Sequence, residues 1–565
     1  MDIRPWKVAM SHTQTFNQAM SKTKRRAQNA AEALPKIALR TPSNKLSSTT
    51  PFAWIGIALL VIAFIARLRL LDIPFERDEG VFTYIGRALM QGELLYTNLY
   101  DNKLPGLYLI YGMFSSVFGV QPTGIHLGAL LWQLATLTVF FLWLREVIGR
   151  DLALASTGLF ALYAASGQVL GFAAHATQLC TLPAIAGLWA MWRGTVQGRG
   201  AQAIWILLAG LGAGLAIWIK QQALFYAVFG GLFLIWWFFG RGRTESITRA
   251  IGIGLLYALG VVLPIGLSAA WFASQGRFDD FWFWTVGIST GDTFKTQAPG
   301  GWFFFNFYFP KVILHWWWVW LSGLYGLAVL LRQKQTPNER ALAVLLPLSL
   351  WGVSLGGAFY PHYFVLALPW LAFCAVIGLN TLLSKYGKSG WVAVALVVLW
   401  PVLAHHGYWF REDHRTILRR AYDNNPFHEM AQIGAELKKR SAPTDSIAII
   451  GSEPELFLYA DRSSALSHLF FQGVVQRHTR YAQFQQQTRE QLWGRKPRFV
   501  VLPGAQYEHL KDDPLVIEIV ERLQKEYHPI CVVDIMENKS QITWDPPPEK
   551  DVPQTLFWVM VLERN

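Results

Sequence analysis

Residues 221–239, QQALFYAVFGGLFLIWWFF, contain no charged side chain over 19 positions. A helix needs roughly 17–25 residues of this kind to cross the hydrocarbon core of a bilayer, so the stretch predicts a membrane span. Eleven further apolar runs lie between residues 51 and 408. Their approximate limits are 52–66, 106–120, 124–145, 151–170, 177–192, 203–219, 250–274, 312–331, 341–358, 362–383 and 389–408.

The composition of the whole chain agrees with a membrane protein. Of 565 residues, 53% are hydrophobic and 15% are charged, whereas soluble domains usually carry about 25% charged residues. The 26 Trp and 37 Phe suit walls that face lipid and the belts at the membrane surface. Only three cysteines are present (Cys180, Cys374 and Cys531), which excludes a disulfide scaffold and a zinc spacing. The sequence therefore predicts a polytopic α-helical membrane protein.

The net charge of +13 is concentrated outside the last third of the chain. Residues 1–50 carry nine Lys and Arg against two acids, residues 51–409 carry 21 against 13, and residues 410–565 carry 20 against 22. A basic segment beside a membrane span usually reports topology or anionic lipid, so we expect no nucleic-acid partner. Residues 1–50, with their basic cluster at 22–26, are predicted to be a disordered cytoplasmic tail.

The positive-inside rule sets the expected number of spans. If the run at 106–120 lies on the membrane surface and the other eleven cross, the inner loops hold 12 basic residues against four acids, and the outer segments hold nine of each. If that run also crossed, the basic loops after it would face outward. We therefore predict eleven spans in a cell membrane, with a cytoplasmic N-terminus and an external C-terminus. Two outer segments follow, at 67–123 and about 275–311, and both are expected to contain helices in the membrane interface.

Two other stretches support this organisation. Residues 210–214, GLGAG, lie inside a span, where small residues allow close helix packing. Residues 410–565 have the composition of a soluble domain and alternate helix-like with β-rich segments, which predicts a small layered αβ domain. The helix-like segments are about 427–440, 479–493 and 514–527, and the expected strands are 446–450, 498–502, 530–534 and about 555–562.

The densest polar cluster follows the first span, between two predicted interfacial helices. It consists of Arg67, Arg69, Asp72, Glu76, Arg77, Asp78, Glu79, Arg87, Glu93, Asp101, Asn102 and Lys103. A solvated loop would explain any one of these charges. Unpaired ions are costly at this depth, however, so the acids and bases should pair or face a cavity. In such a cluster the cations can bind a phosphate while a carboxylate takes a proton from a hydroxyl.

The segments FERDEGVFTYIGRA (75–88), GELLY (92–96) and DNKLPG (101–106) resemble the first external loop of the GT-C glycosyltransferases. The most similar branch comprises bacterial relatives of the dolichyl-phosphate-mannose–protein mannosyltransferases and the lipid A aminoarabinose transferase. The segments WIKQ (218–221), GGAFYPHYF (356–364) and IIGSEP (449–454) add to the resemblance, which covers about 52–565. It implies a GT-C transmembrane domain at 51–409, with a catalytic loop at 67–123, and an external αβ domain at 410–565.

The resemblance also implies an activity. It is the inverting transfer of a sugar from a polyprenyl-phosphate donor to an acceptor at the outer face, which could be protein, lipid or polysaccharide. In this interpretation Asp78 is the general base, Glu79 assists it or orders the loop, and Lys103 and Lys220 neutralise the lipid phosphate. The other expected substrate-binding residues are Arg77, His175, Gln178, Gln221, Tyr360, His362 and Tyr363.

One departure from the family pattern concerns Gln178, which stands where the family often has an acid. A divalent metal is therefore possible but not supported by the sequence, and we assign no metal ligand. A transporter or flippase for a lipid-linked or anionic substrate is the alternative. It predicts broken helices and ionisable residues near the membrane midplane, whereas the charges gather at the outer mouth. A receptor-like role for the C-terminal domain would leave Asp78 and Glu79 unexplained.

Overall fold

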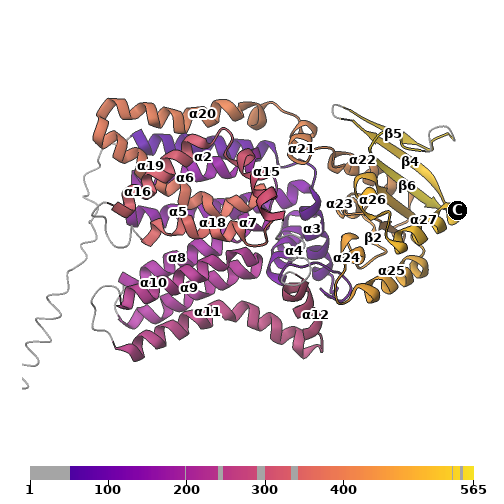
Figure 1. The fold of residues 1–565 in the computed structure, drawn as a ribbon, viewed down its shortest axis with the longest axis horizontal. Helices are drawn as coiled ribbons and strands as arrows, with labels where there is room; N and C mark the ends of the chain where they lie inside the picture. Colours follow the sequence, from indigo (N-terminus) through magenta and orange to yellow (C-terminus); the bar gives the residue numbers. More distant parts are fainter. Residues whose placement is uncertain are drawn as a thin grey trace, which may run out of the picture. The chain divides into compact units, whose positions relative to one another are not determined.

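The computed structural model describes residues 51–196, 199–239, 246–288, 300–332, 341–536, 539–547 and 552–565. The predicted tail at 1–50 lies outside the described residues. The chain from residue 50 onward forms one compact unit. Its first part is helical, and its last part contains a β-sheet covered by helices (Figure 1).

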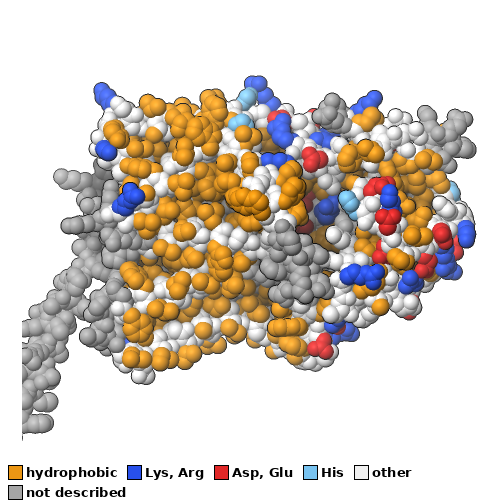
Figure 2. Space-filling view, in the orientation of Figure 1, with side chains coloured by type: hydrophobic (Ala, Val, Ile, Leu, Met, Phe, Trp, Pro, Cys, Tyr) orange, Lys and Arg blue, Asp and Glu red, His pale blue; other side chains and the backbone are white. Residues whose placement is uncertain are grey.

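Each predicted apolar run contains a helix. In chain order these helices are α2 (Pro51–Arg69), α4 (Pro105–Phe118), α5 (Pro122–Ile148), α6 (Arg150–Ala164), α8 (Thr181–Val196), α9 (Arg199–Ile219), α10 (Leu224–Phe239), α11 (Ile247–Ser274), α16 (Trp317–Arg332), α18 (Leu345–Ser354), α19 (Leu368–Tyr386) and α20 (Gly390–Phe410). In Figure 2 hydrophobic side chains cover the helical part, while the sheet-containing part carries most of the charged side chains.

Six helical stretches among the described residues are long and apolar enough to cross a membrane. They are Pro51–Arg69, Pro122–Ile148, Gly200–Ile219, Gln221–Phe239, Ile247–Ser274 and Pro361–Phe410. A seventh is added if α16 and the preceding α15 (Gly301–Ile313), bent by 99° at their junction, form one span. The chain is therefore a multi-pass membrane protein. The expected count of eleven spans stays a prediction, because α6, α8 and α18 are only 15, 16 and 10 residues long.

The close packing predicted at 210–214 is confirmed by the glycines of α9. A Cβ at Gly210 would lie 2.1 Å from the Tyr257 carbonyl oxygen of α11, and one at Gly212 would lie 2.5 Å from Cα of Gly187 on α8. Any larger residue would push these backbones apart. Small residues therefore let α9 lie directly against both neighbours.

The first segment predicted to lie outside, residues 67–123, contains the two expected helices, α3 (Arg77–Met90) and α4, which pack against each other. The second contains α12 (Phe278–Trp282), a π-helical turn, η3 (Phe283–Gly287), and α15. Trp302, Phe303 and Phe307 of α15 are exposed. Exposed aromatic rings suit the membrane interface predicted for this segment.

The C-terminal part begins with α21 (His414–Tyr422) and α22 (Phe427–Arg440). Its six-stranded mixed sheet has the order β2-β1-β3-β6-β4-β5, with β1 parallel to β2 and β3, and β6 antiparallel to β3 and β4. The strands are β1 (Ser446–Ile449), β2 (Ser463–Ser464), β3 (Phe499–Pro503), β4 (Tyr527–Ile535), β5 (Ser540–Trp544) and β6 (Phe557–Arg564). The remaining helices are α23 (Glu455–Ala460), α24 (Gln472–Val475), α25 (Tyr481–Arg495), α26 (Gly504–Leu510) and α27 (Pro514–Glu526).

Arg69 at the end of α2 joins the two parts of the chain. Its guanidinium donates to the carbonyl oxygens of Trp409 (2.8 Å), Tyr408 (2.7 Å) and Glu412 (2.8 Å). Tyr408 and Trp409 lie in the last turn of α20, where carbonyl oxygens have no partner within the helix, and Glu412 follows shortly after the helix. A positive charge at this end also interacts favourably with the helix dipole. The α20 end, from which the αβ domain departs, is therefore fixed.

Candidate active site

Glu76 begins helix α3 and determines how its first turn is presented. The Glu76 carboxylate accepts a hydrogen bond from the backbone N–H of Glu79 at 2.9 Å, which caps the helix. Asp78 and Glu79 thus lie in the first turn, where the helix dipole stabilises negative charge. Glu76 itself is buried, and burial together with the charges of Asp78 and Glu79 raises its pKa well above the ordinary value.

Glu79 points into the protein and ties α3 to two other elements. It is fully buried, accepts a hydrogen bond from the backbone N–H of Ala174 (2.7 Å) and contacts Nε2 of His126 on α5 (2.9 Å). The other ring nitrogen of His126 faces the Leu71 carbonyl at 2.9 Å. Since a carbonyl can only accept, the Glu79–His126 contact needs either a protonated ring or a protonated carboxyl. These contacts support the loop-ordering role expected for Glu79.

Asp78 meets two histidines from distant parts of the sequence. His175 precedes the short helix α7 (Ala176–Leu179), and His362 lies in the 3-10 helix η5 (Pro361–Ala367). Their rings stack with centroids 3.9 Å apart and planes 9° apart. The ligand atoms of Asp78, His175 and His362 all lie within 4.8 Å of one another. Three residues predicted for the site are therefore brought together.

Both histidines are buried, and their nitrogens are poorly satisfied. Neither ring nitrogen of His175 nor Nδ1 of His362 has a hydrogen-bond partner within the described part of the chain. Burial lowers the pKa of His175, which favours the neutral ring. One carboxylate and two neutral imidazoles are a donor set that a transition metal such as Zn²⁺ accepts. Asp78, His175 and His362 could thus hold a divalent ion, although the sequence assigned no metal ligand.

Lys220 supplies a positive charge at the same place. It lies between α9 and the 3-10 turn η2 (Gln221–Ala223), is 7% exposed, and has its Nζ 4.8 Å from the centroid of the Tyr363 ring. Burial, and next the positive charge of Lys103, lower the pKa of Lys220 to about 8, while Asp78 opposes this shift. Lys220 therefore lies within electrostatic range of both Asp78 and Lys103.

The loop that carries Lys103 is connected to the loop that carries Lys220. Gln221 donates to the Asn102 carbonyl at 3.1 Å, and the Lys103 ammonium is hydrogen-bonded to the Asn102 side chain. Asp101 instead accepts hydrogen bonds from the Tyr108 hydroxyl and the Asn102 backbone N–H, both at 2.7 Å. The Lys103 ammonium is thus held by the Asn102 side chain at the end of a well-anchored loop.

Aromatic residues surround the mouth of this cluster. Tyr360 is 39% exposed, and its ring lies 5.9 Å from His362, 5.5 Å from Tyr363 and 5.6 Å from Tyr308 of α15. Burial, and then the charge of Asp78, raise the pKa of Tyr360.

Gln178 lies one turn after His175 in α7 and is buried. Its amide nitrogen has no hydrogen-bond partner among the described residues.

Arg77 is directed elsewhere. Its guanidinium donates to the Ser452 carbonyl and contacts Glu453, both in the αβ domain.

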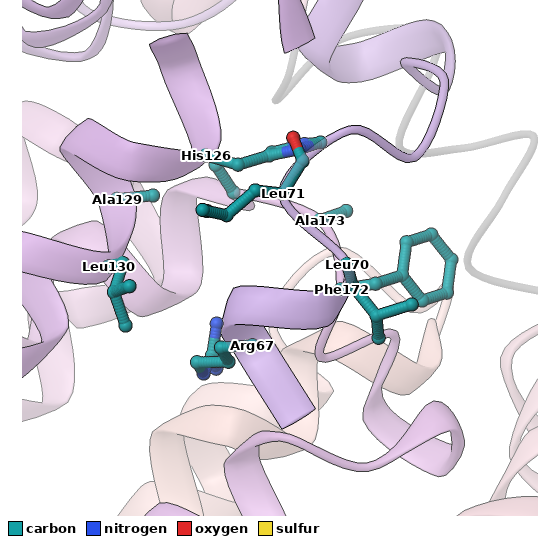
Figure 3. A pocket seen from close by; sticks show the side chains of 9 residues that line it. Arg67, Leu70, Leu71, His126, Ala129, Leu130, Phe172 and Ala173 are labelled. Carbon is teal, nitrogen blue, oxygen red and sulfur yellow. The ribbon is translucent and has the colours of Figure 1, made fainter. Parts of the chain in front are cut away.

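A small pocket near the site is distinct from it. This pocket is lined by Arg67, Leu70, Leu71, His126, Ala129, Leu130, Phe172, Ala173 and Ala174 (Figure 3). It adjoins the Glu79–His126 contact and includes none of the residues predicted for the site.

Sequence reasoning assigned no role in the site to Glu76, His126 or Glu453. The capping role of Glu76 has a local signal, since an acid three residues before the N–H of Glu79 can accept its hydrogen bond. His126 has no such signal, because it lies 47 residues from Glu79 in an apolar helix. Glu453 belongs to a quoted segment, but its contact with Arg77 spans 376 residues.

Comparison with solved structures identifies the fold. ArnT from Cupriavidus metallidurans bound to undecaprenyl phosphate superposes with a TM-score of 0.55 and 16% sequence identity, over 82% of this chain and 95% of that one. The chain has the fold of ArnT. As predicted, a helical membrane domain is followed by a C-terminal domain with a small mixed sheet.

Two further solved structures show similarity to the chain. ArnT in its apo state gives a TM-score of 0.54 at 16% identity, over 81% of this chain and 94% of that one. The Archaeoglobus fulgidus oligosaccharyltransferase gives 0.47 at 12% identity, over 88% and 75%. No protein-family model and no curated protein sequence matches the chain.

Proposed function

We propose that this protein transfers a sugar from a polyprenyl-phosphate donor to an acceptor hydroxyl at the outer face of the membrane. The observation that carries the proposal is the clustering of the Asp78 carboxylate with the buried His175 and His362, with the buried Lys220 in electrostatic range of Asp78. The ArnT fold supports it, because one solved ArnT structure is bound to undecaprenyl phosphate, a lipid of the donor's chemical class.

Asp78 is the general base of the reaction. As the acceptor hydroxyl attacks the anomeric carbon, a carbon–oxygen bond forms to the acceptor and the bond to the phosphate oxygen breaks. The hydroxyl proton passes to Asp78, and the phosphate leaves with the bonding electron pair. A single displacement of this kind inverts the anomeric centre. General-base assistance typically contributes 10²–10⁴-fold to the rate.

Lys220 and Lys103 hold the leaving phosphate. Both ammonium groups are positioned before the reaction, Lys220 by burial and Lys103 by the Asn102 side chain. Fixed positive charge is most effective where water is excluded, because it then stabilises developing negative charge without reorganising. The stacked pair of His175 and His362 forms one wall beside Asp78, and Tyr360 lies at the exposed side, where an acceptor would enter.

The test is a transfer assay on the full-length protein in vesicles. Radiolabelled polyprenyl-phosphate sugars are supplied with membrane extracts as the acceptor source, and labelled product is separated from the donor. We expect transfer by the wild type and loss of transfer in Asp78→Asn with donor binding retained. Movement of intact donor across the vesicle, with no labelled product, would instead support the transporter.

A further inference from the structure

The turn after β1, residues 451–454, lies against the first turn of α3. Arg77 donates from Nε to the Ser452 carbonyl at 2.7 Å, and from one terminal nitrogen to Asn425 (2.9 Å) and Glu453 (3.2 Å). Its guanidinium also lies 5.6 Å from the centroid of the Phe427 ring. These partners all belong to the αβ domain, although Arg77 immediately precedes Asp78 in the chain.

Glu453 is held rigidly at this contact. Its side chain is fully buried, and its carboxylate accepts hydrogen bonds from the Ser452 backbone N–H at 2.8 Å and from the Gln506 side chain. Gln506 in turn accepts from the Ser452 N–H at 2.8 Å, which connects the turn to α26. Moving this carboxylate away would leave the Arg77 guanidinium and the Gln506 amide without their partner, which is costly in a buried site. Glu453 therefore gives Arg77 a defined position.

The backbones of the two parts also touch directly. A Cβ at Gly80 would lie 2.6 Å from the backbone nitrogen of Glu455 and 2.8 Å from its Cα. A real side chain cannot approach so closely, so the 453–455 segment and α3 could not pack in this way with any other residue at position 80. Because Gly80 is only two residues after Asp78, a shift of this segment would displace the turn that carries Asp78.

Two buried acids of the αβ domain lie close to Arg77. Glu453 and Glu455 are both buried, and neither carboxylate oxygen of Glu455 has a hydrogen-bond partner among the described residues. Burial alone would lower the pKa of Arg77, but the neighbouring carboxylates Glu453 and Glu455 more than offset this, and its pKa is raised. Arg77 thus supplies the positive charge between α3 and two acids of the αβ domain.

We propose that Glu453 is a positioning residue: through Arg77 it fixes the first turn of α3 and so the direction of the Asp78 carboxylate, which makes the external domain part of the active site. This inference rests on the proposed function. It gives a role to the 449–454 segment, because the turn in this segment contacts Arg77 although the two lie 375 residues apart in the sequence. It also gives Arg77 a role other than binding the donor phosphate.

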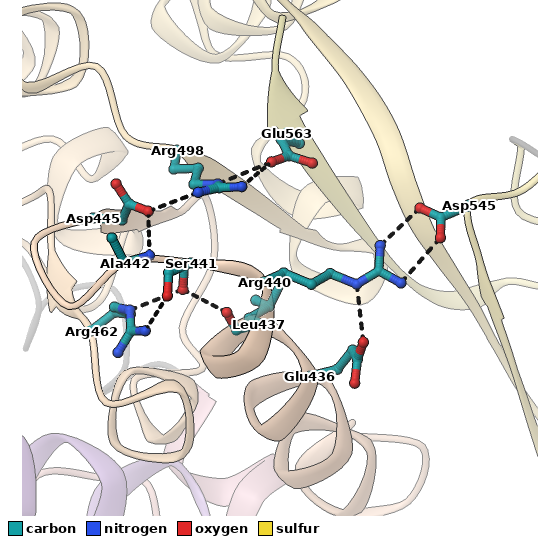
Figure 4. Close-up of polar contacts among 10 residues, drawn as sticks. All are labelled: Glu436, Leu437, Arg440, Ser441, Ala442, Asp445, Arg462, Arg498, Asp545 and Glu563. Carbon is teal, nitrogen blue, oxygen red and sulfur yellow. Dashed lines mark hydrogen bonds and ion pairs between the residues drawn. The ribbon is translucent and has the colours of Figure 1, made fainter.

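The test compares Glu453→Gln with a matched control in full-length protein. Glu453→Gln keeps the size of the side chain and removes its charge. The control is Asp445→Asn, which also removes one charge from an ion pair, with Arg498 at 3.1 Å (Figure 4). Asp445 precedes β1 whereas Glu453 follows it, so the control perturbs the same domain at the opposite end of the same strand.

We expect Glu453→Gln to lower kcat by about 10- to 100-fold with the donor KM within twofold of wild type, since small displacements of a reacting group are costly. Gly80→Ala should do the same from the α3 side, and Asp445→Asn should leave kcat unchanged. The double variant Arg77→Gln/Glu453→Gln should lose no more than Glu453→Gln alone. A Glu453→Gln variant with the kcat of the wild type would overturn the proposal. It would also be overturned if the fold-losses in kcat of Arg77→Gln and Glu453→Gln, measured singly, multiplied in the double variant.

Amide hydrogen exchange separates this inference from the proposed function. In Glu453→Gln, but not in Asp445→Asn, the amides of residues 79–82 in α3 should exchange at least tenfold faster. This readout does not depend on turnover. If the wild type shows no transfer activity while the two variants show this exchange pattern, the proposed function is refuted and the contact between Glu453 and α3 is retained. An active wild type whose Glu453→Gln variant keeps both its kcat and its slow exchange would refute the inference alone.

Discussion

Lys220 offers the most quantitative test of the phosphate site. Its pKa is lowered to about 8, first by burial and then by Lys103. With a pKa of 8, about 90% of the side chains are charged at pH 7 and about 10% at pH 9. If only the charged form binds the donor phosphate, the apparent KM for the donor is divided by the charged fraction and should rise about tenfold between these pH values.

The matched variant is Lys220→Arg, because a guanidinium stays charged throughout this range. A donor in which phosphate links sugar and lipid carries one negative charge at both pH values, so its own ionisation does not contribute. The assay measures the donor KM at half-unit steps from pH 7 to 9, with kcat followed separately. A flat profile for wild type, or the same tenfold rise in Lys220→Arg, would refute the assignment of Lys220 to the phosphate.

Four further predictions can be checked with single variants or simple treatments. Asp78→Asn should lower turnover per folded molecule by about 10²–10⁴-fold; a destabilised but fully active variant would remove Asp78 from the mechanism. Glu79→Gln should mainly lower the melting temperature, because breaking a buried pair costs about 3–5 kcal/mol, and unchanged melting would exclude the His126 contact as a stabilising one. Turnover should survive EDTA, since Lys103 and Lys220 supply the positive charge; loss that Zn²⁺ or Mn²⁺ restores would make Asp78, His175 and His362 metal ligands. Cysteines in the 385–389 loop should react only in permeabilised cells, whereas cysteines at 453–463 should react in intact cells, and outside labelling of both would refute the eleven-span topology.

The helices and most strands were predictable because their signals are local. Each apolar run contains a helix, and α22 has the predicted limits of 427–440. The alternation of helix and strand also identified β1, β3, β6 and the centre of β4. The strands β2 and β5 were missed, because β2 has only two residues and β5 is half-buried, so neither shows a distinct run of apolar residues.

The site was only partly predictable, because its geometry depends on contacts between distant segments. The sequence and its family resemblance named Asp78, His175, Lys220 and His362, and the fold brings them together. They did not indicate that the two histidines would stack, nor that Arg77 would turn toward the αβ domain. Both features depend on the packing of side chains from elements more than 150 residues apart, which no local pattern records.

The Arg69 contact ties the last helix of the membrane domain to the first. Arg69 ends the first predicted span and binds carbonyl oxygens at the end of the last one, so a side chain joins the two ends of the membrane domain at one point. The first and the last helix of the membrane domain therefore lie against each other, although they are far apart in the sequence. The last helix cannot separate from the first without opening the four hydrogen bonds that Arg69 donates to the carbonyls of Trp409, Tyr408 and Glu412. A cut between α19 and α20 should accordingly leave two fragments that stay together in detergent, and Arg69→Met should let them come apart.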